Sequence, residues 1–252
     1  MTPQSTPWNH VFITGASSGL GEHVARQLAD QGCKVTICAR SKDALEAIAA
    51  SSPNIFAHVA DVTDAKGLKD LVQQIEQERG PIDLAMFSAG AWFPGSITDL
   101  QLDNFSRTLD VNLMGVANAL DAVLPAMLER GSGHISWISS VAGYIGLPNA
   151  AAYGASKSAL IHMAESAHGE LKRRGIALSV INPGFVRTKL TDKNKFPMPF
   201  LMEPEPAATK IIDGLKRKKF EIAFPWQMVW ILKTIQILPY WISLRLLGRL
   251  AG

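Results

Sequence analysis

Short apolar runs and longer amphipathic segments follow one another along this chain, and the pattern predicts strands that alternate with helices. The run from Val11 to Thr14 leads into a segment with helical spacing of apolar residues, and the run from Cys33 to Ala39 does the same. Four more apolar runs continue the alternation. The expected strands are 11–14, 33–39, 55–59, 83–87, 134–139 and 176–181, and the expected helices are 20–31, 41–50, 64–78, 103–130 and 151–174.

Strands that are separated by helices predict a parallel sheet, because parallel neighbours need a long crossover connection. Right-handed crossovers place helices on both faces of that sheet, so we expect an α/β fold with a doubly wound parallel sheet. No internal repeat and no Ser/Gly-rich linker divides the chain, so residues 1–252 are assigned to a single domain. Ligands of such sheets bind outside the carboxyl ends of the strands.

The alternation stops at residues 191–206, where four prolines interrupt any regular element. We interpret this segment as a flap over the substrate site.

A second departure is the apolar C-terminal segment, residues 224–252. It contains no acidic residue, carries Lys233, Arg245 and Arg249, and follows a basic run at 216–219. Trp226, Trp230, Tyr240 and Trp241 lie among its aliphatic residues. Such a composition is typical of helices in a membrane interface, and a subunit interface would bury the same residues equally well. Lys233 divides the most apolar stretch, so no membrane-spanning helix is expected.

Composition and charge exclude several classes of function. A hydrophobic content of 47% with twenty glycines favours a globular α/β protein, and the net charge of +3 without a basic-aromatic run argues against a nucleic-acid partner. The start of the chain lacks the features of a secretory signal. Cys33 and Cys38 are too far apart in a strand for a disulfide, and the six histidines form no ligand motif, so no metal is expected. We expect a cytoplasmic protein, with peripheral membrane attachment as the alternative.

A glycine-rich turn joins the first strand to the first helix. In TGASSGLG, Gly15, Gly19 and Gly21 allow backbone to approach a pyrophosphate at a helix N-terminus, although glycines can also form a simple tight turn. The remaining candidates in the turn are Ser17, Ser18 and Leu20.

Further motifs follow this turn in a fixed order. They are Asp61-Val62, Ser88-Ala89-Gly90, Asn112, Ser140, Tyr153-x-x-x-Lys157 and Pro183-Gly184. Over nearly its whole length the chain resembles the classical short-chain dehydrogenases. The resemblance implies a Rossmann fold, nicotinamide-dependent redox chemistry and a homodimer or homotetramer. Phe87 and Ser88 replace the two asparagines that this family carries before Ala-Gly, which weakens that one motif.

Tyr153 and Lys157 are four residues apart in a helical segment, so their side chains project from one face. A phenol exchanges protons poorly at neutral pH until a nearby ammonium stabilises the phenolate, and we expect Lys157 to supply that field. The resemblance implies that Lys157 also binds the nicotinamide ribose, that Ser140 holds the substrate oxygen, and that Asn112 positions a water leading from Lys157 to solvent.

The end of the second strand indicates which cofactor is used. Dinucleotide sites for NAD place a carboxylate there, whereas this chain has Arg40, which can pair with a 2′-phosphate. NADP is therefore favoured over NAD, although Arg40 could be a solvated surface residue. Ser18 stands where many NADP-dependent relatives have a basic residue, so one cation is evident.

The remaining cofactor residues are assigned by resemblance. Asp61 and Val62 are expected to hold the adenine, with helix capping as the alternative for Asp61. Ser88, Ala89 and Gly90 permit close approach to the cofactor, and the loop with Pro183, Gly184, Val186 and Thr188 is expected to contact the nicotinamide.

These expectations combine into an NADP(H)-dependent interconversion of a carbonyl and an alcohol. The expected substrate is a small apolar alcohol or ketone, because Trp92, Phe93 and the segments 145–148 and 196–202 are largely apolar. Two alternatives stay open. They are a sensor that binds NADP(H) without turnover, and a membrane-associated interaction protein.

Overall fold

The computed structural model describes residues 6–194 and 196–248, and it contains one seven-stranded sheet. All neighbouring strands are parallel, in the order β3-β2-β1-β4-β5-β6-β7. The strands are β1 His10–Thr14, β2 Lys34–Ala39, β3 Ile55–Val59, β4 Leu84–Phe87, β5 Gly133–Ile138, β6 Ile176–Pro183 and β7 Glu221–Phe224. The expected doubly wound parallel sheet is confirmed.

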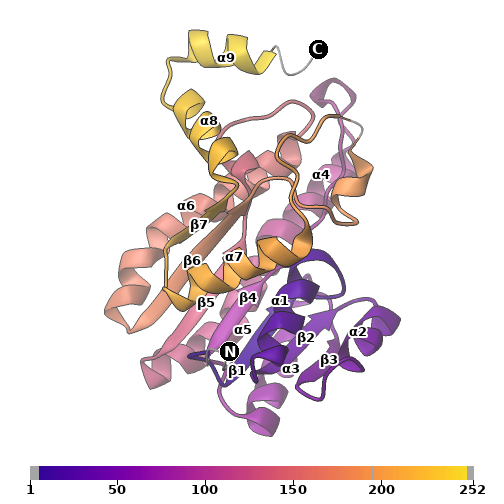
Figure 1. The fold of residues 1–252 in the computed structure, drawn as a ribbon, viewed down its shortest axis with the longest axis vertical. Coiled ribbons are helices and arrows are strands. Elements are labelled where there is room, and N and C mark those ends of the chain that lie inside the picture. Colours follow the sequence, from indigo (N-terminus) through magenta and orange to yellow (C-terminus); the bar gives the residue numbers. More distant parts are fainter. Residues whose placement is uncertain (1–5, 195, 249–252) are drawn as a thin grey trace.

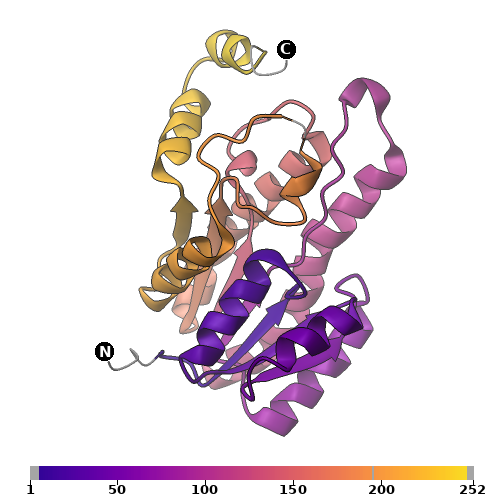
Figure 2. The ribbon, with the colours of Figure 1, turned by 45° about the vertical axis from the view of Figure 1, so that its right-hand side comes forward.

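Helices cover both faces of the sheet (Figures 1 and 2). One apolar core lies under α1, α2 and α7, and the second lies under α3, α5 and α6. The helices are α1 Gly19–Asp30, α2 Lys42–Ala49, α3 Ala65–Arg79, α4 Leu102–Leu109, α5 Gly115–Arg130, α6 Ala151–Arg173, α7 Pro204–Lys216, α8 Trp226–Gln236 and α9 Tyr240–Gly248. Successive residues of the strands alternate between the cores, as in β1, where Ile13 belongs to the first and Phe12 to the second.

The strand order reverses next to β1, which pairs with β2 on one side and with β4 on the other. Connections leave the carboxyl ends of β1 and β4 in opposite directions, and this leaves a crevice between them. The sequence motifs expected to bind the cofactor follow these two strands and their neighbours.

Two elements, α7 and β7, were not expected from the sequence. Pro204 and Pro206 made the start of α7 look irregular, yet both lie in the first helical turn, where a missing N–H costs nothing. The flap segment 191–206 therefore overlaps the helix. Strand β7 has only four residues and follows a basic run, so its apolar signal is weak.

The expected helix 103–130 contains a wide turn. Between α4 and α5 the backbone forms one π-helical turn, Asp110–Met114. Residues 102–130 are long and apolar enough to cross a bilayer, contrary to the expectation that no such stretch exists. Buried residues such as Val116, Ala119 and Val123 pack in the second core, so this helix has the character of a core helix.

The basic run at 216–219 lies apart from the C-terminal helices. The sequence had suggested that this run and the apolar segment form one surface, and the structure separates them. Lys216 donates to Gln31 at the end of α1, and the carbonyl of Lys219 accepts from Ser179. Strand β7 separates this run from α8, so the two lie at opposite ends of a strand. Arg249 and residues 250–252 of the expected segment lie outside the described residues.

Candidate active site

The turn between β1 and α1 packs directly against the loop after β4. Gly15 has a φ of +67°, and a Cβ on this residue would lie 2.4 Å from the backbone N and Cα of Ala89. Gly19 has a φ of +64° and faces the Thr188 methyl group, which would lie 3.1 Å from an added Cβ. Only glycine fits both the conformation and the space at Gly15. The binding of a pyrophosphate at this turn stays a prediction.

A cavity of about 480 Å³ opens along this turn. Its walls include every residue expected to bind the cofactor or take part in catalysis except Gly21 and Asn112. Gly21 lies behind the turn, where a Cβ would lie 3.0 Å from both the Ala16 Cα and the Ser88 Oγ. Its role is to let α1 pack closely on the sheet. Within the described ranges, no group of three His, Cys, Asp or Glu side chains is placed to hold a metal ion.

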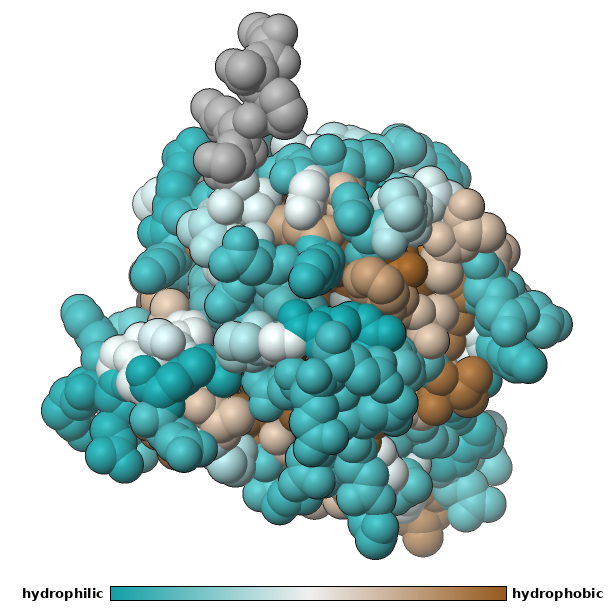
Figure 3. Space-filling model, turned by 90° about the horizontal axis from the view of Figure 1, so that it is seen from below, coloured by the Kyte–Doolittle hydropathy of each residue, from teal (hydrophilic) through white to brown (hydrophobic). Residues whose placement is uncertain are grey.

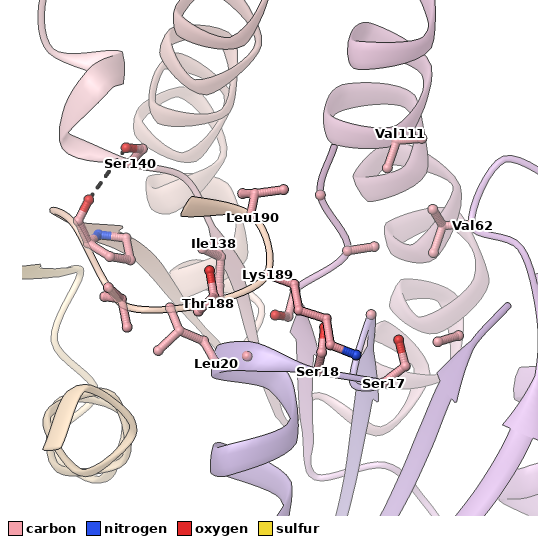
Figure 4. Close-up of a pocket in the computed structure, with 18 of the residues that line it drawn as sticks. Ser17, Ser18, Leu20, Val62, Val111, Ile138, Ser140, Thr188, Lys189 and Leu190 are labelled. Carbon is pink, nitrogen blue, oxygen red and sulfur yellow. Dashed lines mark hydrogen bonds between the residues drawn. The ribbon is translucent and has the colours of Figure 1, made fainter. Parts of the chain in front are cut away.

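The sequence did not indicate several residues that line this cavity. They are Ala39, Ser41, Ala60, Val111, Ile138, Ser139, Lys189, Leu190 and Thr191. Lys189 is the most informative, because it adds a cation where the sequence had suggested only Arg40. In Figure 4 its side chain extends across the pocket toward Ser17 and Ser18 of the glycine-rich turn. Its position after Thr188 in the loop following β6 was the available signal.

Helix α6 places Tyr153 and Lys157 side by side, one turn apart. The Lys157 Nζ lies 5.4 Å from the centre of the Tyr153 ring and donates to the carbonyl of Ile138 at 2.8 Å. Ser140 begins the 3₁₀ turn after β5 and lines the cavity with Tyr153; its hydroxyl donates weakly to the carbonyl of Pro183 at 3.4 Å and accepts from the Ala142 N–H at 3.1 Å. Three of the four side chains expected to be catalytic, those of Ser140, Tyr153 and Lys157, thus lie together at the cavity wall, and Asn112 lies outside its lining.

Burial dominates the protonation of this cluster. Burial raises the pKa of the Tyr153 phenol, and the nearby Ser140 hydroxyl partly offsets this rise. Burial also lowers the pKa of Lys157 from 10.5 to about 7. The sequence argument had expected the lysine charge to make the phenol more acidic. The described geometry instead favours a protonated Tyr153, which is the form that can donate a proton.

The buried ammonium of Lys157 yields a stability prediction. Because its folded pKa of about 7 lies below its ordinary 10.5, the folded state holds fewer protons than the unfolded state between these values. The wild type therefore gains stability as the pH rises through that window. We expect Lys157→Met to raise the melting temperature by about 2–4 °C or more at pH 6.5 and by less at pH 9.5.

Thermal melts at the two pH values check this, with Lys172→Met as the control, because Lys172 is exposed on the same helix. An equal change in melting temperature at both pH values for Lys157→Met would contradict the assignment.

Asn112 lies in the π-helical turn and is fully buried. Its amide nitrogen donates to the carbonyl of Ala91 at 3.1 Å and to the hydroxyl of Ser156 at 3.0 Å, and its oxygen accepts from the Ala91 N–H at 2.7 Å. Asn112 therefore ties the loop after β4 to helix α6. The extra residue of the π turn points this amide at both partners. Its part in a proton path stays a prediction.

Arg40 and Asp61 face each other across the end of the cavity, with 3.9 Å between the Arg40 Nη1 and the Asp61 Oδ2. The other carboxylate oxygen of Asp61 accepts from the backbone and hydroxyl of Thr63, at 2.9 and 2.8 Å. The backbone bond from Thr63 is the main cause of the lowered pKa of Asp61. The N-cap residue of α3 is Asp64, so the alternative that Asp61 caps this helix is wrong.

Aromatic side chains lie on the Tyr153 ring and in the flap segment. Trp92 packs edge-on against it with 5.0 Å between ring centres, and the Trp92 indole donates to Asn194 of the flap segment at 2.9 Å. Phe196 of the same segment packs on Phe185. The ring of Phe93 lies under the guanidinium of Arg107 on α4.

Similarity to known proteins agrees with this arrangement. The short chain dehydrogenase family model matches residues 9–197. An uncharacterized oxidoreductase of Myxococcus xanthus is 37% identical over 232 residues, which cover 90% of this chain and 92% of the relative.

Two solved structures share the fold. An actinorhodin polyketide ketoreductase with NADPH has a TM-score of 0.81 at 25% identity, covering 90% of this chain and 99% of the other. An alcohol dehydrogenase of the archaeon Thermococcus sibiricus, complexed with 5-hydroxy-NADP, has a TM-score of 0.78 at 26% identity, covering 86% and 96%. This chain belongs to the short-chain dehydrogenase family of oxidoreductases.

Proposed function

We propose that this protein is an NADP(H)-dependent oxidoreductase that interconverts a carbonyl and an alcohol on an apolar substrate. The observation that carries the proposal is the cluster of Ser140, Tyr153 and Lys157 at the wall of the cavity that begins at the glycine-rich turn. A proton donor, an orienting hydroxyl and a cation beside a dinucleotide-sized cavity are the groups that carbonyl reduction needs.

The cavity fits a dinucleotide. Gly15 lets the turn pack against the Ala89 backbone at the edge of the cavity, and the amino end of α1 is oriented to favour the negative charge of a pyrophosphate. Ser17, Ser18 and Lys189 line the same part of the cavity and would face the phosphates. Asp61 and Val62 would lie at the adenine, and Pro183, Gly184, Val186 and Thr188 at the nicotinamide.

The bound nicotinamide would supply or accept the hydride. Ser140 would hold the carbonyl oxygen by its hydroxyl, next to the phenol of Tyr153. In reduction Tyr153 donates its proton to that oxygen as negative charge develops, and in oxidation it receives the proton. The raised pKa of Tyr153 favours the donating form at neutral pH. Lys157 lies against the Tyr153 ring, where it can return a proton to the phenol or stabilise the charge of the phenolate.

NADP is favoured over NAD by the charges at the adenosine end. Arg40 lines the cavity, its side chain is largely exposed, and Ser41 beside it adds a hydroxyl. Together they can bind a 2′-phosphate through charge-assisted hydrogen bonds. The ketoreductase and the archaeal alcohol dehydrogenase, solved with NADPH and with an NADP derivative, support this assignment by analogy.

Arg40→Ala tests the cofactor assignment. Loss of one charge-assisted contact to the 2′-phosphate is expected to lower kcat/KM for NADPH by about 10–100-fold, while kcat/KM for NADH changes by less than about threefold. Steady-state kinetics with both cofactors measure this. Lys42→Ala is the matched control, because Lys42 is an exposed neighbouring cation outside the cavity lining. Equal losses with both cofactors would contradict 2′-phosphate recognition.

The substrate proposal follows from the side chains around Tyr153. Trp92 packs directly on the Tyr153 ring, and Phe185, Phe196, Ile145 and Leu147 add apolar surface beside the turn that follows Ser140. We therefore expect NADPH oxidation with aliphatic, steroid-like or acyl ketones, and little with sugars of similar size. A spectrophotometric screen at 340 nm tests the activity. Turnover only with sugars or charged ketones would overturn the apolar assignment, and no turnover with any carbonyl would overturn the function.

A further inference from the structure

Helices α8 and α9 expose a concentration of large apolar side chains. Six of them have between 61% and 82% of their surface exposed, namely Trp226, Trp230, Ile237, Tyr240, Trp241 and Leu244. We call these six residues the C-terminal apolar patch. Isolated exposed apolar residues are normal on soluble proteins, whereas six within nineteen consecutive residues indicate an interaction surface.

The patch is held on the body of the protein by the inner face of α8. Met228 and Leu232 are buried in a small core with Val141 and Tyr144, the residues that follow Ser140. Lys233 donates to Glu221 at 2.5 Å, and Tyr144 donates to the same carboxylate at 2.6 Å. The outer face of α8 carries Trp226 and Trp230, and Ile237, which follows the last residue of the helix, continues the same side at this spacing. This side faces solvent because the opposite side is already packed.

The patch lies at the same end of the molecule as the mouth of the active site. Helix α8 begins two residues after the carboxyl end of β7, and α8 and α9 extend beyond the flap segment in Figures 1 and 2. The opposite end of the molecule presents a largely hydrophilic surface (Figure 3). The exposed Phe196 and Phe200 of the flap segment add apolar surface at the active-site end.

The charge of the C-terminal segment distinguishes between two candidate partners of the patch, a second copy of this chain and a lipid bilayer. From residue 222 to residue 252 the sequence contains no Asp or Glu. Of its three basic residues, Lys233 is already paired with Glu221, Arg245 lies on α9, and Arg249 lies outside the described residues. A symmetric contact between two copies would place the patch against itself, and the basic groups would meet no carboxylate of the patch. A bilayer with anionic headgroups offers the complementary charge, together with the interfacial environment that Trp and Tyr prefer.

The dimensions of the helices restrict the binding mode. Helix α8 has 11 residues and α9 has 9, separated by a break that contains Pro239. Each is far shorter than the roughly 20 residues needed to cross a bilayer. The segment can therefore lie in the interface but cannot span it.

We propose that the C-terminal apolar patch binds the surface of a lipid bilayer that contains anionic headgroups. Binding inserts the aromatic side chains at the headgroup level and holds the active-site end against the membrane. If the proposed function is also correct, an apolar carbonyl substrate reaches Tyr153 from the lipid phase; that consequence rests on the proposed function, whereas membrane binding does not.

Vesicle co-sedimentation tests the proposal with the full chain and liposomes of phosphatidylcholine containing 30% phosphatidylglycerol. The wild type is expected to bind, and Trp230→Glu/Trp241→Glu is expected to reduce the partition coefficient by about tenfold or more. Ile97→Glu/Leu102→Glu is the matched control, because both residues are similarly exposed but lie near α4. That control is expected to bind as the wild type does.

Thermal melts and turnover of a water-soluble ketone separate loss of binding from loss of folding, and both are expected to stay unchanged in the tryptophan variant. Failure of the wild type to bind, or equal binding by the tryptophan variant, would overturn the proposal. If the wild type does not bind vesicles and sediments as a dimer, while the tryptophan variant sediments as a monomer, the patch is an interface with a second copy. Vesicle binding without any carbonyl turnover would retain this proposal and overturn only the proposed function.

Discussion

Tyr153→Phe is expected to lower kcat by about 10²–10⁴-fold while leaving NADPH binding within about threefold of the wild type. The substitution removes the hydroxyl proposed to transfer the proton and preserves the ring that packs against Trp92 and Lys157. NADPH oxidation measures the first effect, and fluorescence titration with NADPH measures the second. Tyr240→Phe serves as the control, because the Tyr240 ring is exposed on α9.

The same variant separates the enzyme from a cofactor sensor. An enzyme loses turnover and retains cofactor affinity, whereas a sensor has no turnover to lose. Full activity in Tyr153→Phe would move the proton transfer to another group and would contradict the assignment of the α6 cluster.

Gly15→Ala is expected to abolish NADPH binding and to reduce the free energy of unfolding by about 2–5 kcal/mol. Two effects add here, because the backbone has a φ of +67° and the new methyl group would lie 2.4 Å from the Ala89 backbone. The loop after β4 must move away, and this widens the part of the cavity that would hold the pyrophosphate. Urea unfolding followed by tryptophan fluorescence, together with NADPH titration, measures both effects.

Gly32→Ala isolates the contribution of backbone conformation. Gly32 has a φ of +88°, but nothing lies within 4 Å of an added Cβ. We expect a loss of only about 1–2 kcal/mol and normal NADPH binding in this control. A Gly15→Ala protein that behaves like Gly32→Ala would show that the close approach of the two loops is dispensable.

Much of the site could be predicted because its residues belong to short segments with local rules. The glycine-rich turn, Ser140 and the Tyr153–Lys157 pair each follow a strand or begin a helix, and a parallel sheet brings such positions to one edge. Lys189 was missed because a lysine in an irregular loop has no periodic signal. Its place in the cavity depends on how the loop after β6 folds back over Gly19.

Other features depend on tertiary context that sequence patterns do not contain. The short strand β7 forms through pairing with β6, and the π turn at Asn112 is stabilised by hydrogen bonds to Ala91 and Ser156. The pKa of Lys157 depends on burial, which outweighs the simple expectation from two neighbouring side chains. Assembly into a homodimer or homotetramer stays a prediction.

Glu221 connects three parts of the protein through one carboxyl group. Its oxygens accept from Tyr144 in the turn after Ser140, from Asn182 at the end of β6, and from Lys233 on α8. Helix α8 therefore has a polar link to the strand that leads into Pro183 and to the turn that begins at Ser140. A displacement of α8 would lengthen bonds in the turn that begins at Ser140, so forces applied at the periphery of the fold are transmitted to the residue proposed to orient the carbonyl.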